Sequence, residues 1–217
     1  GDGAIIQFCI IQDVVVGGFG ATNGIGVKVG SCLETSFENV DSYNNYNNWE
    51  IPPNISGPTS TIFIECHARA GYNIGWKLQS GYGLTWANCV FESNAKEALW
   101  CSNSTSMHNL TFIGSHVESN WTSLSGGARQ AEASFRFVGV GGSGLRQITI
   151  INGDFDLGNS AAPRSGDINN VKDFKWDNVA SNNPLMLRGA TTGYSANFAI
   201  DSSASPLFEF FDTAHLH

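Results

Sequence analysis

The sequence predicts an all-β protein, a right-handed parallel β-helix (a solenoid) of about eight coils of roughly 25 residues each. Three observations lead to this fold: an internal repeat of that length, short segments in which apolar and polar residues alternate, and turns marked by Gly, Asn and Ser. One coil cannot bury its own apolar face, but stacked coils bury it together. We expect a single β-helix domain over residues 1–217.

The repeat is clearest between residues 84–94 and 110–120, which align without a gap. Upstream, residues 61–70 fit the same pattern and pair Cys66 with Cys89. Downstream, residues 150–156 follow after a longer interval that contains a Gly/Ser-rich insertion. The pattern therefore predicts the same strand in every coil. Its further copies are expected at 10–16, 37–42, 174–179 and 198–201.

A second, shorter strand recurs between these segments. Residues 25–29 and 74–78 are nearly identical and lie two coils apart. Further copies are expected at 97–101, 134–138 and 184–188. Loop insertions are expected near residues 43–60, 121–132 and 158–170, and the first of them replaces the second strand by an Asn/Pro-rich loop.

Rival all-β folds fit the spacing less well. A β-sandwich has hairpin turns every 8 to 12 residues or so, and a propeller has about 40 residues per blade. No segment shows a convincing helical period of 3.6 residues. We therefore expect one turn position per coil. These positions are Asp13, Asn39, Glu65, Asn88, Gly114, Gly153, Asp177 and Asp201.

Charge and composition exclude several classes of function. Only 14% of the residues are charged and the net charge is −8, which argues against general binding of nucleic acid and against docking on anionic lipid. No apolar run is long enough to insert into a membrane. The first residues read like the middle of a strand, and no signal peptide precedes them, so we expect the chain to be a fragment of a longer protein.

The cysteines and histidines indicate neither a disulfide framework nor a metal site. Five cysteines, an odd number, stand without a Cys-x-x-Cys pair, and we expect all five to be buried thiols. No grouping of His, Cys and Asp has the spacing of metal ligands. We expect neither a metal nor another cofactor.

The repeat itself produces the candidate site. Phe91 and its counterparts alternate with acidic residues, so the acidic side chains are expected to point outward in successive coils. Stacked carboxylates raise one another's pKa, which is one way to build an acid/base pair for glycoside cleavage. The alternative is a structural ladder or a subunit contact. The expected outward column consists of Arg69, Glu92, Glu118 and Asp156, with the three acids as candidate catalytic residues.

Aromatic and histidine side chains are expected beside this column. Trp76 and Trp121 are candidates for a sugar-stacking surface, whereas Trp86 and Trp100 are expected to point inward or to cover loops. His67 and His116 are expected on the same face or at its edge. The candidate substrate-binding residues are therefore Arg69, Trp76, Trp121, His67 and His116.

Segments of the repeat resemble a known group of proteins. Phe91-Glu-Ser-Asn94, Val117-Glu-Ser-Asn120 and the strand Gly24-Ile-Gly-Val-Lys-Val29 resemble the repeat of phage tailspike and tail fibre proteins with a pectate-lyase-like, single-stranded right-handed β-helix. The resemblance covers most of residues 5–211. It implies a homotrimer in an extracellular virion tail, contacts with other tail proteins, and attachment to host surface polysaccharide, often with depolymerisation. The calcium-binding cluster of pectate lyases and the polygalacturonase motifs are absent, so no catalytic residue is carried over by motif.

Two main readings of function follow. The first is a viral receptor-binding tailspike that attaches to host surface polysaccharide and in some cases depolymerises it. The second is a secreted polysaccharide lyase or glycoside hydrolase of the same fold. A bacterial β-helical surface adhesin is a third reading, which the irregular insertions disfavour. Two carboxylates paired in a groove with aromatic residues would indicate an enzyme, whereas an acidic column inside a subunit interface would indicate a shaft.

Overall fold

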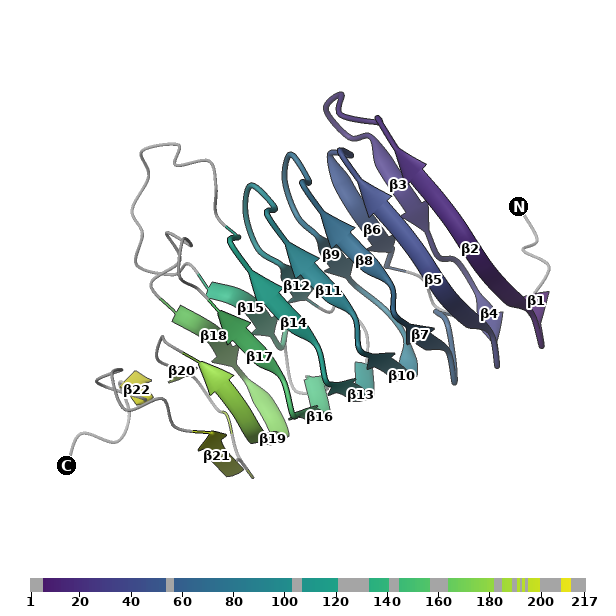
Figure 1. The fold of residues 1–217 in the computed structure, drawn as a ribbon. Helices are drawn as coiled ribbons and strands as arrows, with labels where there is room; N and C mark the ends of the chain where they lie inside the picture. Colours follow the sequence, from purple (N-terminus) through teal and green to yellow (C-terminus); the bar gives the residue numbers. More distant parts are fainter. Residues whose placement is uncertain are drawn as a thin grey trace.

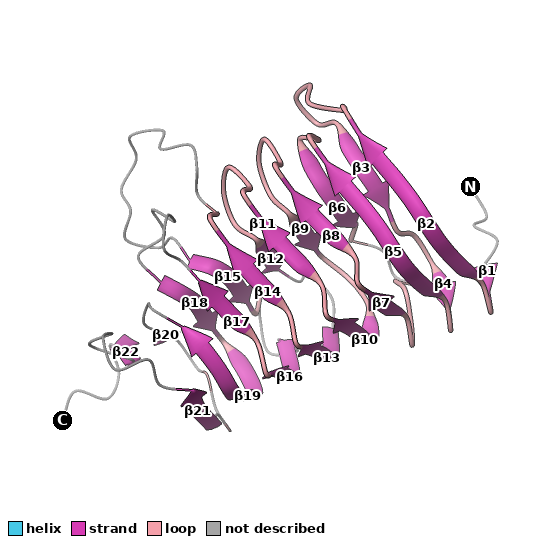
Figure 2. Ribbon diagram, in the orientation of Figure 1, coloured by secondary structure: helices cyan, strands magenta, loops and turns pink. Residues whose placement is uncertain are grey.

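A computed structural model shows an all-β protein with long parallel sheets (Figure 1). The described residues form no helix (Figure 2). The structure describes residues 6–53, 57–102, 107–120, 133–140, 145–156, 164–181, 185–188, 191, 193, 195–199 and 208–211. The strands are β1 (Ile6–Gln7), β2 (Ile10–Gly17), β3 (Ile25–Lys28), β4 (Cys32–Leu33), β5 (Ser36–Tyr43), β6 (Asn47–Ile51), β7 (Ile62–Ile64), β8 (His67–Arg69), β9 (Trp76–Leu78), β10 (Tyr82–Ala87), β11 (Val90–Glu92), β12 (Leu99–Ser102), β13 (Met107–Ile113), β14 (His116–Glu118), β15 (Ala133–Val138), β16 (Leu145–Ile151), β17 (Asp154–Asp156), β18 (Arg164–Asn169), β19 (Val171–Ser181), β20 (Leu185–Arg188), β21 (Ser195–Ala199) and β22 (Phe208–Phe211).

Most of the strands form three parallel ladders, and the chain passes through them in turn (Figure 1). The short strands β1 and β4 pair with each other in a separate two-stranded sheet. The first ladder runs β2, β5, β7, β10, β13, β16, β19, and the second runs β2, β5, β8, β11, β14, β17, β19. The long strands β2, β5 and β19 belong to both ladders, so the two make one sheet. The third ladder is a separate eight-stranded sheet, β3, β6, β9, β12, β15, β18, β20, β22. This arrangement is compatible with the predicted parallel β-helix.

The pairing register confirms the central part of the repeat. Leu84 pairs with Leu110 and Phe91 with Val117, as the ungapped alignment predicts. Near the C-terminus the prediction is wrong in detail. Residue 150 pairs with Trp176 rather than with Phe174, and a β-bulge shifts the next pairing. The repeat alone did not locate that bulge.

Residues in the left-handed backbone region separate the first ladder from the second. Asn88 has a φ of 53° and Gly114 a φ of 61°. Among the described residues, equivalent left-handed positions between the two ladders are Asp13, Asn39, Glu65, Asn152 and Asn178. Asn and Gly tolerate this conformation better than other residues. Five of the predicted turn positions are confirmed. Gly153 and Asp177 are each off by one residue, because the corner falls at Asn152 and Asn178. Asp201 lies outside the described residues. The confirmed positions are Asp13, Asn39, Glu65, Asn88 and Gly114.

Two of the predicted insertions contain strands of the third ladder. Residues 47–51 form β6, which pairs with β3 and β9, so the prediction of a loop throughout 43–60 is wrong. Residues 164–169 form β18, so the insertion at 158–170 is shorter than predicted. Asn47 and Asn48 are buried in β6, where their amides form hydrogen bonds, and this polar composition hid the strand. The insertion at 121–132 lies outside the described residues.

Aromatic stacks between the ladders form the core. On the inner face of the first ladder, Phe37, Phe63, Trp86 and Phe112 stack at ring-centroid distances of 5.2, 5.1 and 4.5 Å. On the third ladder, the rings of Trp49 and Trp76 stack in nearly parallel planes, with their centroids 4.3 Å apart, and meet the first stack edge-on. Offset stacked and edge-to-face pairs are the favoured arrangements of aromatic rings. These contacts tie the two sheets together.

The cysteines form no disulfide in the structure. All five cysteines are free; Cys32, Cys66, Cys89 and Cys101 are buried as predicted, whereas Cys9 is partly exposed. Burial raises the pKa of the Cys89 thiol well above its ordinary value. No helix long and apolar enough to cross a membrane occurs in the described part of the chain.

Candidate functional site

The second ladder carries an outward column of charged side chains. Tyr43, Arg69, Glu92 and Glu118 are in direct register on four successive strands. The backbone of Asp156 follows Glu118 in the same register, but its side chain lies outside the described residues. The register predicted for the column is therefore present. Neighbouring strands of such a ladder lie about 4.8 Å apart.

Arg69 of this column is already paired with Asp41, a residue of β5. Its Nε lies 3.0 Å from Asp41 Oδ1 and 3.2 Å from Asp41 Oδ2, and its Nη2 also donates to Oδ2. These hydrogen bonds raise the pKa of Arg69. The guanidinium lies 6.0 Å from the centre of the Tyr43 ring, within reach of a cation–π contact. The Arg69 side chain is 49% exposed, so the pair lies at the surface.

A second outward column runs beside the first. His67, Val90, His116 and Asp154 are in register on successive strands, and Asp41 precedes them. The imidazole of His116 lies between two carboxylates. Its Nε2 is 3.1 Å from an oxygen of Glu118 and its Nδ1 is 3.7 Å from an oxygen of Asp154. The structure therefore brings His116 and Glu118 into direct contact, a link that the sequence reasoning did not make.

The tryptophans predicted to bind sugar are not part of this surface. Trp76 is fully buried and stacks on Trp49, so its assignment to the substrate surface is wrong. It alternates along β9 with the outward Lys77. Trp121 lies outside the described residues. Trp86 points inward as expected, whereas Trp100 is at a partly exposed, outward position of β12.

A second charged group, on the third ladder, was missed. Glu97 is buried just before β12, and its carboxylate lies 3.6 Å from Arg136 Nη1. The same guanidinium, through Nε, lies 3.3 Å from the buried carboxylate of Asp167. Burial raises the pKa of Glu97, and Arg136 opposes that effect to a smaller extent. The register of the third ladder would have been needed to find this group, because its members lie on or next to three different strands, β12, β15 and β18.

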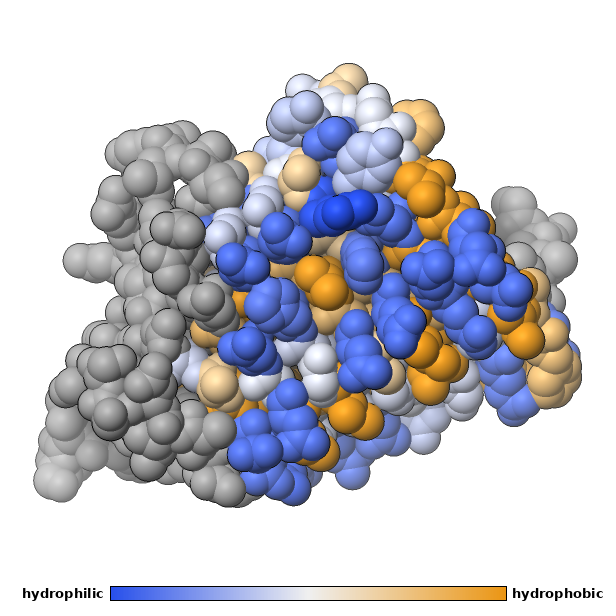
Figure 3. All heavy atoms as spheres, viewed as in Figure 1, coloured by the Kyte–Doolittle hydropathy of each residue, from blue (hydrophilic) through white to orange (hydrophobic). Residues whose placement is uncertain are grey.

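The two groups suit different chemistry. The second ladder offers solvent-accessible carboxylates and imidazoles in two parallel columns, and side chains of these types can hydrogen-bond a polar ligand. Figure 3 shows many hydrophilic side chains across this face, with hydrophobic groups interspersed among them. The Glu97 carboxyl instead lies buried against an arginine. No cluster of three or more potential metal ligands exists among the residues that the structure describes.

Fold and surface together define an all-β protein of parallel ladders with charged outward columns. The ORF18 protein of Geobacillus virus E2 shares this fold, with a TM-score of 0.65 and 15% sequence identity over 96% of the chain. The chain spans 41% of the length of that viral protein. A second match, to QnrB1, a plasmid-mediated fluoroquinolone resistance protein, is 11% identical over 87% of the chain and 92% of that protein. Its TM-score of 0.17 is too low to indicate a shared fold. No family model matches the sequence, and no curated protein matches it.

Proposed function

We propose that this chain is part of a phage tailspike or tail fibre that attaches to host surface polysaccharide. In this proposal the three ladders are the faces of a right-handed parallel β-helix of about eight coils. The protein would act as an extracellular homotrimer in the virion tail, together with other tail proteins. Two things support the proposal: the fold shared with a virus protein, and the tailspike-like repeat of the sequence.

The observation that carries the proposal is the alignment of polar groups on the second ladder. Arg69, Glu92 and Glu118 follow one another from strand to strand, and His67 and His116 stand beside them in the next column. A regular row of hydrogen-bonding groups suits an extended ligand with a repeating structure. A polysaccharide is such a ligand, and its hydroxyl groups can pair with carboxylates, imidazoles and guanidinium groups.

Depolymerisation of the glycan is the second part of the proposal. Adjacent strands would place the Glu92 and Glu118 carboxyl groups about 5 Å apart, the separation typical of retaining glycosidases. Glu118 and His116 are in contact, so a proton can pass between them. The alternatives remain a secreted polysaccharide lyase or glycoside hydrolase of this fold, and a bacterial adhesin.

Binding and cleavage can be tested separately. The purified protein is incubated with surface polysaccharides of candidate bacterial hosts, and binding is measured by interferometry. We expect the double variant Glu92→Gln/Glu118→Gln to lose most of the binding, whereas Glu34→Gln, an exposed acid on another edge, should bind like the wild type. Failure of every host glycan to bind, or equal binding by both variants, would contradict the proposed site.

Chain shortening measures the enzymatic part. Size-exclusion chromatography of the glycan after incubation should show shorter chains with the wild type and intact chains with the double variant. Binding without shortening would leave attachment and remove depolymerisation. A monomeric mass for the full-length protein would count against the tailspike reading.

A further inference from the structure

A row of one tyrosine and three basic side chains lies along a different edge of the molecule, where the first ladder begins. Tyr82, His108, Arg146 and Lys172 are in direct register on β10, β13, β16 and β19. We call these four residues the basic edge. Arg146 and Lys172 are exposed, and each follows a buried apolar residue of the core.

The basic edge stands out in a protein with a net charge of −8 and only 11 Lys and Arg residues. Like charges directly opposite one another on neighbouring strands repel. Within the described residues, no carboxylate forms an ion pair with Arg146 or Lys172, whereas Arg69, Lys77, Arg136 and Lys175 all have one. The nearest acid along the chain, Asp173, occupies a left-handed corner, with Oδ1 beside Gly193. An anionic ligand would relieve this repulsion.

An aromatic surface adjoins the cations. The rings of Tyr82 and His108 meet at a centroid distance of 4.1 Å and an interplanar angle of 63°, and Tyr82 is 41% exposed. Exposed aromatic rings held in place by a neighbour bind flat, partly apolar faces, and the C–H face of a pyranose is one of these. The basic edge therefore combines a surface for a sugar ring with cations for its acidic groups.

Hydroxyl groups line the neighbouring column. Thr85, Thr111 and Thr149 are in register on the outer face of the first ladder, and Lys175 extends that column. All three threonines are half-buried. Each hydroxyl can donate one hydrogen bond and accept others, which suits the hydroxyl groups of a saccharide.

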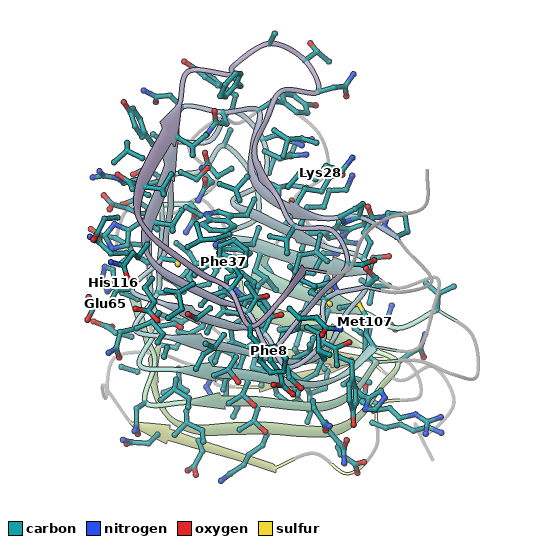
Figure 4. The ribbon with its side chains drawn as sticks, turned by 90° about the vertical axis from the view of Figure 1, so that its right-hand side faces the viewer. Phe8, Lys28, Phe37, Glu65, Met107 and His116 are labelled. Carbon is teal, nitrogen blue, oxygen red and sulfur yellow. The ribbon has the colours of Figure 1, made fainter. Side chains whose placement is uncertain are left out.

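We infer that the basic edge binds an acidic polysaccharide in an extended conformation, with a sugar ring on Tyr82 and acidic groups on Arg146 and Lys172. The cations repeat at the strand spacing of about 4.8 Å, close to the advance of one sugar along an extended chain. Figure 4, which looks down the stack of strands, shows His116 on one side and Met107, the sequence neighbour of His108, towards the opposite side. This site is therefore separate from the second-ladder columns. The inference rests on the proposed polysaccharide attachment and specifies an acidic class of glycan.

The test uses defined polysaccharides and matched charge variants. Binding of the purified chain to alginate, dextran sulfate, neutral dextran and single-stranded DNA is measured by interferometry. We expect binding to alginate or dextran sulfate but not to dextran, and comparison of the two separates carboxylate from sulfate. The double variant Arg146→Gln/Lys172→Gln should lose about tenfold or more in affinity, because each charge-assisted hydrogen bond contributes substantially. Tyr82→Ala should weaken binding as well.

The controls distinguish a specific binding site from a nonspecific effect of the net charge of the protein. Lys28→Gln/Lys96→Gln removes two exposed lysines elsewhere, with the same change in net charge, and should bind like the wild type. Arg146→Lys/Lys172→Arg keeps the charges and should retain binding. Equal losses in both Gln variants, tighter binding to DNA than to alginate, or no binding of either acidic glycan would overturn the inference. If host polysaccharide binds but only Glu92→Gln/Glu118→Gln abolishes it, the proposed function stands and the basic edge does not.

Discussion

The side-chain amide of Asn94 donates a hydrogen bond to the side-chain carbonyl of Asn120, at 2.9 Å, and both residues are fully buried. Asn94 also donates to the carbonyl of Ala68 and accepts from Asn48. In each Glu-Ser-Asn segment the Ser occupies the left-handed region and the Asn turns inward. The motif that carries the resemblance to tailspikes is therefore a turn that joins the second ladder to the third.

Removal of the Asn94 side chain should destabilise the protein strongly. Asn94→Ala leaves the Asn120 carbonyl and the Asn48 amide each without one buried partner, which we expect to lower the free energy of unfolding by about 2 to 4 kcal/mol. Urea denaturation followed by circular dichroism measures the change. Gln12→Ala, at an exposed position of β2, should change it little. Equal stability of both variants would rule out a stabilising role for the amide ladder.

Trp76 should behave as a core residue and not as a sugar platform. Trp76→Ala removes the stack on Trp49 and leaves a cavity, and should cost about 3 to 5 kcal/mol of unfolding free energy. Trp76→Phe keeps part of the packing and should lose less. Thermal denaturation and glycan binding are measured on the same samples. Reduced binding by Trp76→Phe with unchanged stability would restore the sugar-stacking assignment.

The corner between the first and second ladders should select for residues that tolerate a positive φ. Glu65 has a φ of 51°, so Glu65→Gly should stabilise the protein by up to about 1 kcal/mol, as relief of left-handed strain outweighs the added chain entropy. Gly114→Ala should destabilise it, because the new Cβ would lie 2.5 Å from Asn88 Oδ1 at a φ of 61°. Chemical denaturation of the two variants should give shifts of opposite sign. Shifts of the same sign would contradict this account.

The columns of the second ladder were predictable because the repeat from residue 84 to residue 120 has no gap. Coil-equivalent positions then determine which side chains align, and Glu92 beside Glu118 follows directly. The inward position of Trp76 was also readable, since Ile74, Trp76 and Leu78 alternate with Gly75 and Lys77. The contact between Glu97, Arg136 and Asp167 was not readable. It depends on strand β18, which lies within a predicted insertion, and on the length of the segments between coils.

Glu97 gives the protein a dependence of stability on pH. Burial raises its folded-state pKa above the ordinary value of 4.5. The folded state therefore favours the protonated form, and the stability from this proton is fully present below pH 4.5 and is lost as pH rises through the raised pKa. Glu97→Gln removes the titrating group, so its unfolding free energy should gain on that of the wild type from pH 4.5 towards 7. Loss of the Arg136 contact shifts the curve but adds no opposite slope in this range, because arginine does not titrate there. Urea denaturation at a series of pH values gives the two curves, with Glu34→Gln as the exposed control. Parallel curves for the wild type and Glu97→Gln would show that burial does not perturb this carboxyl.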